Sequence, residues 1–284
     1  MLRNWRDLQS LTYLTALPLL VAWQWRHGFS WPLYAAVLFL TLGVGVIHHN
    51  HAHLPMWHSR WLNRQGDFWL TLLQGHPTYV FHATHVANHH RYRHGPQDIV
   101  RTYRFGDHNH LAGYLLHPLQ AVPVLYPVFV AWLRQLQRRD PAALRYCQLQ
   151  YAAVLMLWGS LAWLDWQKWL LLVLIPQLHG LHWLLATNYL QHAHADGHSR
   201  INYARNFEGW VNPLLFNIGL HTAHHEHPRA HWSELTALHQ RYRSQVDPRL
   251  NAGGLLPYMC RTFLLSLVLP RHRSHSLMAP PETH

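Results

Sequence analysis

Four clusters of histidine lie along this chain, and each comes just beyond a long apolar segment. In the last cluster, His221, His224 and His225 stand at positions i, i+3 and i+4, which share one face of a helix. Neutral imidazole is the commonest protein ligand for metals near neutral pH, and it suits iron, zinc, copper and nickel. The repetition of such clusters predicts a fold that gathers histidines from distant parts of the chain around metal ions.

The apolar segments predict a membrane protein. Four segments without charged residues are candidate spans, at about 11–25, 31–47, 149–164 and 169–187. Each approaches the ~20 residues that cross a hydrocarbon core. The links within each pair are so short that each pair must form an antiparallel hairpin. We therefore predict an all-α membrane protein with four transmembrane helices arranged as two hairpins.

The remaining chain is polar and rich in histidine, and we predict that it forms a cytoplasmic helical cap from residues 48–148 and 188–270. Within it, Pro118, Pro123 and Pro127 favour interfacial or re-entrant helices over a straight span, because proline interrupts helix hydrogen bonding. Residues 271–284 are expected to be a flexible tail. The whole of 1–284 is predicted to be one domain.

The charges predict the topology. The formal net charge is +11, yet Arg26 and Lys168 are the only basic residues in the two hairpin turns. All other Lys and Arg residues fall on the opposite side, a strong positive-inside asymmetry. Both termini and the histidine clusters are therefore expected to be cytoplasmic, at the inner or plasma membrane of a bacterium. The basic residues form no patch with interleaved aromatics, which argues against nucleic acid and favours the lipid bilayer as partner. A soluble helical protein is the less favoured alternative.

Helical spacing selects the candidate ligands. His49 and His53 share a face, as do His85 and His89, while His90 is rotated by about 100° and is free to reach a second metal. Asn188 and His192 stand one turn apart. The predicted metal ligands are nine imidazoles: His49, His53, His85, His89, His90, His192, His221, His224 and His225. A metal with an open position needs only about three protein ligands, so nine suit two metals.

These boxes resemble those of the integral-membrane fatty acid desaturase and hydroxylase superfamily, which includes the alkane monooxygenases. The matching motifs are His49-x3-His53, His85-x3-His89-His90 and His221-x2-His224-His225, with Asn188-x3-His192 after the fourth span. The resemblance covers most of the chain. It implies a di-iron, O2-dependent oxidoreductase of lipid and fatty acid metabolism that acts on an acyl or alkyl chain, with no catalytic residues beyond the metal ligands. It also implies a separate electron donor of ferredoxin, rubredoxin or cytochrome type with its reductase.

Several further roles are predicted around these ligands. Asn188 is expected to act on the metal through water, His82 and His194 are candidate additional ligands, and Asp98 and Glu226 are candidates for orienting ligand N–H groups. Side chains alone cannot abstract hydrogen from a methylene, so a cofactor must supply that chemistry. Desaturation of a fatty acyl chain is the predicted reaction. Hydroxylation by a monooxygenase and decarboxylation to a terminal alkene remain open.

Non-catalytic alternatives fit the pattern less well. A membrane haem protein needs isolated histidines deep within spans, and only His179 and His182 suit that role. A metal-binding transporter or buffer usually carries low-complexity histidine repeats, which these boxes are not. A zinc protease would need an HExxH motif, and a carboxylate-rich di-iron bundle would need acids within the clusters, where Glu226 alone occurs.

Overall fold

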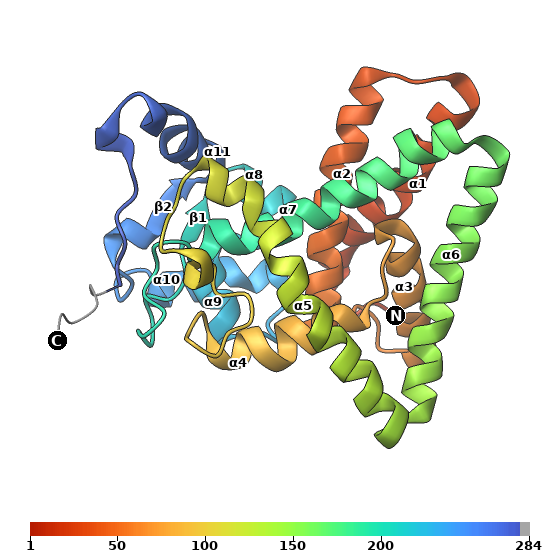
Figure 1. Cartoon of the computed structure of the whole chain (residues 1–284), viewed down its shortest axis with the longest axis horizontal. Coiled ribbons are helices and arrows are strands. Elements are labelled where there is room, and N and C mark those ends of the chain that lie inside the picture. Colours follow the sequence, from red (N-terminus) through yellow and green to blue (C-terminus); the bar gives the residue numbers. More distant parts are fainter. Residues whose placement is uncertain (279–284) are drawn as a thin grey trace. The chain divides into compact units, whose positions relative to one another are not determined.

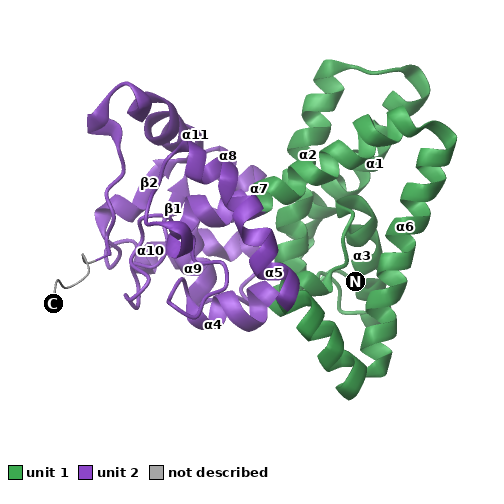
Figure 2. Ribbon diagram, in the orientation of Figure 1, with its two compact units in different colours: residues 1–83, 128–184 green, residues 84–127, 185–284 purple. Residues whose placement is uncertain are grey.

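The computed structural model describes residues 1–278 and is built almost entirely of helices (Figure 1). The chain divides into two compact units (Figure 2): unit 1 comprises residues 1–83 and 128–184, and unit 2 comprises residues 84–127 and 185–284. Each unit is described separately below. That the whole chain forms one domain stays a prediction.

The first half of the chain contains the longest helices. Its elements are η1 (Trp5–Asp7), α1 (Leu8–His27), α2 (Trp31–His53), α3 (Arg60–Gln74), the π-helix η2 (Phe81–His89), α4 (His90–Tyr92), η3 (Thr102–Phe105) and α5 (Leu111–Arg139). Gly28, with a φ of +97°, ends α1, and Pro32 lies in the first turn of α2, where its missing N–H costs nothing. Within unit 1, α1 packs against α2 and α3.

The second half begins with a long helical run and ends in short elements. These are α6 (Pro141–Trp169), the π-helix η4 (Leu170–Leu174), α7 (Ile175–His192), β1 (Asn206–Glu208), α8 (Val211–Leu214), α9 (His221–Glu226), η5 (Trp232–Glu234), α10 (Leu235–Tyr242), η6 (Pro248–Leu250), β2 (Asn251–Gly254), α11 (Leu255–Met259), the π-helix η7 (Cys260–Leu264), η8 (Leu265–Leu267) and η9 (Pro270–His272). The Asp140 side chain caps α6 by accepting from the Ala143 amide.

Three helical stretches in residues 1–278 are long and apolar enough to cross a membrane: α2, α5 and the run from Pro141 to His192. The run contains α6 and α7 and is broken at Asp165, whose backbone is extended (φ −164°, ψ 97°). The fold is thus that of an all-helical membrane protein, as predicted. Residues 11–25 form part of α1 but do not belong to these three stretches, so the arrangement as four spans in two hairpins remains a proposal.

α5 differs from the sequence expectation. Pro118, Pro123 and Pro127 all lie inside one continuous helix of 29 residues, where separate interfacial or re-entrant pieces were predicted. Each proline removes only its own backbone hydrogen bond, whereas ending the helix would leave many polar groups unsatisfied in apolar surroundings. The helix therefore continues through all three.

The core of unit 2 fixes the end of α7. Buried side chains of α5, α7, β1 and the α11 region pack together there, including Tyr114, Tyr189, Leu190, Phe207 and Phe263. Strands β1 and β2 pair in parallel, with Asn206 opposite Asn251. This packing holds the last turn of α7, which carries His192, in a defined place.

The expected tail is partly ordered. The Ser274 hydroxyl lies 3.0 Å from Nδ1 of His194, and the Leu277 amide donates to the carbonyl of His194 over 3.1 Å. Leu277 also packs against Val246 and Leu250 of a small apolar cluster. Residues 271–278 therefore belong to unit 2, which corrects the prediction for this stretch. The rest of the predicted tail lies outside the described residues.

Candidate metal centre

Four histidines of unit 2 bring ring nitrogens to within 4.8 Å of one another, and we call them the quartet: His89, His192, His221 and His225. All four are buried. Nε2 of His221 lies 3.0 Å from Nε2 of His192 and 3.1 Å from Nε2 of His225. An imidazole nitrogen has one in-plane position for a hydrogen bond, as donor or as acceptor. Nε2 of His221 can therefore bond one of these neighbours but not both, whereas a shared cation would satisfy all of them.

In two of the quartet rings, a hydrogen bond at Nδ1, on the side away from the other histidines, shows which nitrogen carries the proton and which carries the lone pair. Nδ1 of His192 donates to the carbonyl oxygen of Tyr203 over 2.7 Å, and Nδ1 of His89 donates to Oδ2 of Asp98 over 2.6 Å. In a neutral ring, a proton on Nδ1 leaves Nε2 as a bare lone pair. Nε2 of His89 is buried and has no hydrogen-bond partner among residues 1–278. Bare, enclosed lone pairs that face one another fit a metal ion.

A second set of histidines in unit 2, the trio, has the same character. It consists of His85, His90 and His224, whose ligand nitrogens also lie within 4.8 Å of one another. Nε2 of His90 stands between Nε2 of His85, at 2.9 Å, and Nε2 of His224, at 3.0 Å. The central nitrogen again has two close neighbours for a single hydrogen-bonding position, which fits a second cation.

The π-helix η2 decides which histidines meet. A π-helix bonds residue i to residue i+5, so His85 and His90 come together and His89 turns toward the quartet. The α-helical spacing had predicted that His85 and His89 share a face; their rings do lie 5.1 Å apart, but their ring nitrogens belong to different groups. The short helix α9 divides its histidines in a similar way, since His221 and His225 join the quartet and His224 joins the trio.

Comparison with known families agrees with this geometry. The family model described as fatty acid desaturase matches residues 9–252, which is most of the chain. The chain belongs to the fatty acid desaturase family. The resemblance found in the sequence is thereby confirmed. No curated protein matches the chain. Family membership, the apolar helices and the histidine clusters together make this desaturase-family chain a membrane-bound oxidoreductase whose histidines could bind metal.

The first histidine box of this desaturase-family chain lies in unit 1, at the end of α2. The rings of His49 and His53 are 5.1 Å apart, with ligand nitrogens within 4.8 Å, as one turn of helix predicts. The two other histidines of the box have separate partners. Nδ1 of His48 is bonded to Gln74, and Nδ1 of His51 accepts from the Met56 amide. Only His49 and His53 of this box therefore belong to a candidate metal group.

Asp98, which was predicted to orient a ligand N–H group, lies against a histidine of the quartet. It accepts from His89, and it also accepts the backbone amides of His94 (2.8 Å) and Val100 (2.9 Å). Burial by itself raises the pKa of Asp98, but the electrostatic interaction and hydrogen bond with the His89 ring and the Val100 amide outweigh it and bring the pKa below its ordinary value. The carboxylate is thus charged and holds His89 in one tautomer.

Glu226 acts less directly than predicted. Its Oε1 accepts from Arg93 at 2.7 Å and from the Tyr203 hydroxyl at 2.8 Å, so it does not orient a ligand itself. Tyr203 connects it to the quartet, because its ring packs 5.3 Å from that of His225 and its carbonyl accepts from His192. Burial, followed by the bond to Glu226, raises the pKa of Tyr203 and keeps it neutral.

The predicted additional ligands lie outside both histidine groups. His82 is exposed, and Nδ1 of His194 is bonded to Ser274. Asn188 uses its amide nitrogen to donate to the carbonyl of Val100 over 2.8 Å, which ties α7 to the loop that carries Asp98. A role for Asn188 on a metal through water stays a prediction.

Burial favours the neutral form of two quartet imidazoles, His192 and His225, and a metal ligand must be neutral. Burial, followed by the charges of His90 and His221, lowers the pKa of His225 well below its ordinary value. His94, for which the spacing predicted nothing, is equally enclosed: burial lowers its pKa to about 3. Neither of its ring nitrogens has a hydrogen-bond partner among the described residues, and its ring stacks on that of His192 with centroids 5.0 Å apart. It therefore forms part of the wall behind the quartet.

Proposed function

We propose that this protein is an O2-dependent, non-haem di-iron membrane oxidase that desaturates a fatty acyl chain. The proposal rests on the two histidine groups. In each group, the Nε2 atom of one histidine has two close imidazole neighbours but can form a hydrogen bond with only one of them. Membership of the desaturase family supports iron as the metal and a lipid chain as the substrate.

Each group would hold one iron. The quartet of His89, His192, His221 and His225 would bind the first. The trio of His85, His90 and His224 would bind the second, and Asn188 would act on a metal through water. His49 and His53 are proposed as further metal ligands because they are paired histidines with a one-turn spacing. Imidazole is a ligand that iron accepts readily.

Bound iron would supply the redox chemistry by which O2 removes hydrogen from an unactivated chain. Removal of two hydrogen atoms accounts for only half of the electrons needed to reduce O2 to water, so two more must come from outside. The described residues hold Cys147 and Cys260 as isolated thiols, with no cysteine cluster for an iron–sulfur donor. A separate ferredoxin, rubredoxin or cytochrome with its reductase would deliver these electrons.

The protein residues would position the ligands and exclude water. Asp98 and the Tyr203 carbonyl fix the tautomers of His89 and His192, so their Nε2 lone pairs point inward before any metal binds. Enclosure of the quartet keeps bulk water from the reacting centre and limits side reactions.

The proposed topology follows the charges. Four spans in two hairpins would place both termini and the histidine boxes on the cytoplasmic side of a bacterial inner or plasma membrane, where soluble electron donors have access. The long apolar helices support a membrane location.

Product analysis tests the reaction. Lipids from cells that express the protein would be compared by mass spectrometry with lipids from cells that express His225→Ala, which lacks a quartet ligand, and His227→Ala as the matched control. His227 follows the same box but bonds Tyr242 and lies outside both groups. Desaturation predicts acyl chains lighter by two hydrogens in the wild type and in His227→Ala only. Chains heavier by one oxygen would identify a hydroxylase instead, and no change would reject an acyl-chain oxidase.

A further inference from the structure

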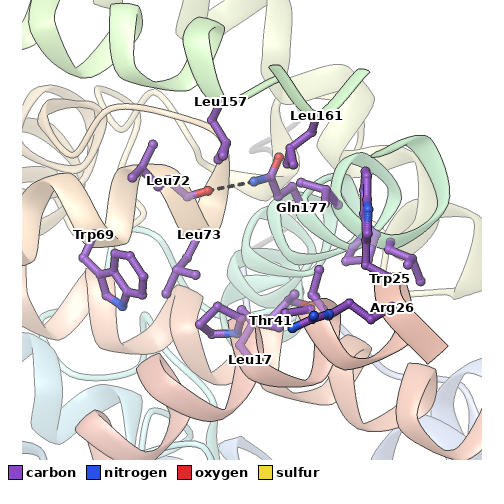
Figure 3. Close-up of a pocket in the computed structure, with 16 residues that line it drawn as sticks. Leu17, Trp25, Arg26, Thr41, Trp69, Leu72, Leu73, Leu157, Leu161 and Gln177 are labelled. Atoms are coloured by element: carbon purple, nitrogen blue, oxygen red, sulfur yellow. Dashed lines mark hydrogen bonds between the residues drawn. The ribbon is translucent and has the colours of Figure 1, made fainter. Parts of the chain in front are cut away.

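Unit 1 contains an apolar pocket of about 340 Å³ among α1, α2, α3, α6, η4 and α7 (Figure 3). Leucine, valine, alanine, proline and tryptophan side chains make up almost all of its lining. This volume is near the lower end of the ~300–1,000 Å³ typical of small-molecule sites. Such a space suits one alkyl chain.

The uncharged polar groups of the lining are already satisfied within the protein. Gln177 donates to the carbonyl of Leu72 and accepts from the indole of Trp158, both over 2.9 Å. The Thr41 hydroxyl donates to the carbonyl of Leu38. Away from Arg26, a ligand in this pocket therefore meets an apolar surface, which disfavours a wholly polar molecule as the occupant.

One charged side chain lines the pocket. Arg26 stands beside Trp25 on the side opposite Trp69 (Figure 3), and no carboxylate among residues 1–278 pairs with it. Lys168 also lies nearby, with its Nζ 5.9 Å from the centre of the Trp25 ring, but it is paired with Asp165 over 3.4 Å, so Arg26 is the cation left for a ligand. The ligand that matches this arrangement has an apolar chain and an anionic head.

Exposed tryptophans indicate the depth in the bilayer at which that anionic headgroup would lie. Trp23, Trp31, Trp163 and Trp166 lie on the segments next to the two turns, and all are more than half exposed. Tryptophan in this position is typical of the boundary between hydrocarbon and headgroups. Arg26 thus lies at headgroup level, and the rest of the pocket lies at the level of acyl chains.

The pocket is distinct from the proposed site of oxidation. Arg26 lies at the turn before α2, whereas His49 lies 18 residues beyond Trp31 near the other end of that helix, a rise of about 27 Å. We infer that this pocket binds one acyl chain of an anionic bilayer phospholipid, with its phosphate on Arg26. The second chain of the lipid would stay in the bilayer. This inference requires the membrane location but neither the metals nor the reaction.

Native mass spectrometry of the full-length protein in a mild non-ionic detergent tests the inference. Dioleoylphosphatidylglycerol, dioleoylphosphatidylcholine and oleate would be added separately, and bound molecules counted. We expect one phosphatidylglycerol per chain, bound about fivefold more tightly than phosphatidylcholine, because one basic side chain near an anionic head contributes about that factor. Equal binding of the two phospholipids, or tighter binding of oleate, would overturn it.

Two kinds of variant locate the site. Arg26→Gln should abolish the preference for phosphatidylglycerol, whereas Arg134→Gln, which removes an exposed arginine of α5 outside the pocket, should preserve it. Leu73→Trp and Leu161→Phe fill the pocket from different helices and should each reduce binding of both phospholipids. Their melting temperatures identify a variant that fails to fold. If a folded pocket-filling variant binds lipid as the wild type does, or Arg134→Gln abolishes the preference, the inference is wrong.

Discussion

Asp98 accepts a hydrogen bond of 2.6 Å from Nδ1 of His89, and both side chains are almost completely buried. The same carboxylate accepts two backbone amides of its own loop, those of His94 and Val100. One ionised group therefore connects the loop with the tautomer of a quartet histidine and the direction of that histidine's Nε2. Such a partner is expected to contribute strongly to metal affinity.

Replacing Asp98 tests that contribution. Asp98→Asn keeps the shape of the side chain but removes its charge, and its amide nitrogen cannot accept a hydrogen bond. We expect metal affinity to fall by about 10–100-fold. Competition against a chelator of known affinity, followed by metal analysis, measures this. Asp107→Asn is the matched control, because Asp107 is an exposed acid of the same region that bonds Ser276. Equal metal affinity in the two variants would show that Asp98 does not support a ligand.

The sequence predicted which histidines gather into clusters better than it predicted the residues that support them. His49 and His53 pair as helical spacing predicts, because α2 continues past its apolar segment. Asp98, by contrast, returns to His89 through a turn in which Arg93 and His94 have positive φ, a conformation that no spacing rule predicts. Asp98 was a candidate only because it lies near a box.

The division of the second box could not be predicted for a related reason. His85 meets His90 only because residues 81–89 form a π-helix, and nothing in their composition separates a π-helix from an α-helix. The candidate spans were predicted more successfully at α2 and α7 than at α5. There, three prolines suggested a break, although the surrounding apolar residues maintain the helix.

Gly75 ends α3 in a conformation that requires glycine. Its φ is +73°, and an added Cβ would lie 2.6 Å from Oε1 of Gln177 and 2.9 Å from the Trp158 ring. A left-handed backbone conformation costs alanine about 1–2 kcal/mol. Because of the added clash, Gly75→Ala should lower the free energy of unfolding by more than this amount. Gly253→Ala is the control, since Gly253 has a φ of +71° and nothing within 4 Å. Thermal unfolding in detergent should show the larger loss for Gly75→Ala; equal losses would mean that this contact is not tight.

Asp67 makes the stability of unit 1 depend on pH. Burial raises its pKa to about 6, although the Tyr146 hydroxyl and the charge of Arg64 act in the opposite direction; Nε2 of His51 also lies 3.6 Å away. Because the folded pKa exceeds the ordinary value of 3.8, the folded state binds the proton more tightly. Asp67 therefore makes its full contribution to the free energy of unfolding below the pKa of the unfolded state, and this contribution is lost as pH rises through the pKa of the folded state.

Asp67→Asn removes that titration. The variant should gain on the order of 3 kcal/mol relative to the wild type between about pH 4 and about pH 7.5, as a shift of about two pKa units implies. The gain should appear as a melting temperature several degrees higher, relative to the wild type, at the higher pH. A difference between the two proteins that stays constant across this range would show that Asp67 titrates normally.

The most direct test of the account is the number of iron atoms per chain. Metal analysis of the purified wild type should give two, and His227→Ala, outside both groups, should also give two. His225→Ala should weaken iron binding at the quartet and His224→Ala at the trio, so each variant should retain fewer than two irons per chain, because each substitution removes one ligand from one group only. One iron or none in the wild type, or unchanged iron in both histidine variants, would contradict the proposal of two histidine-bound irons.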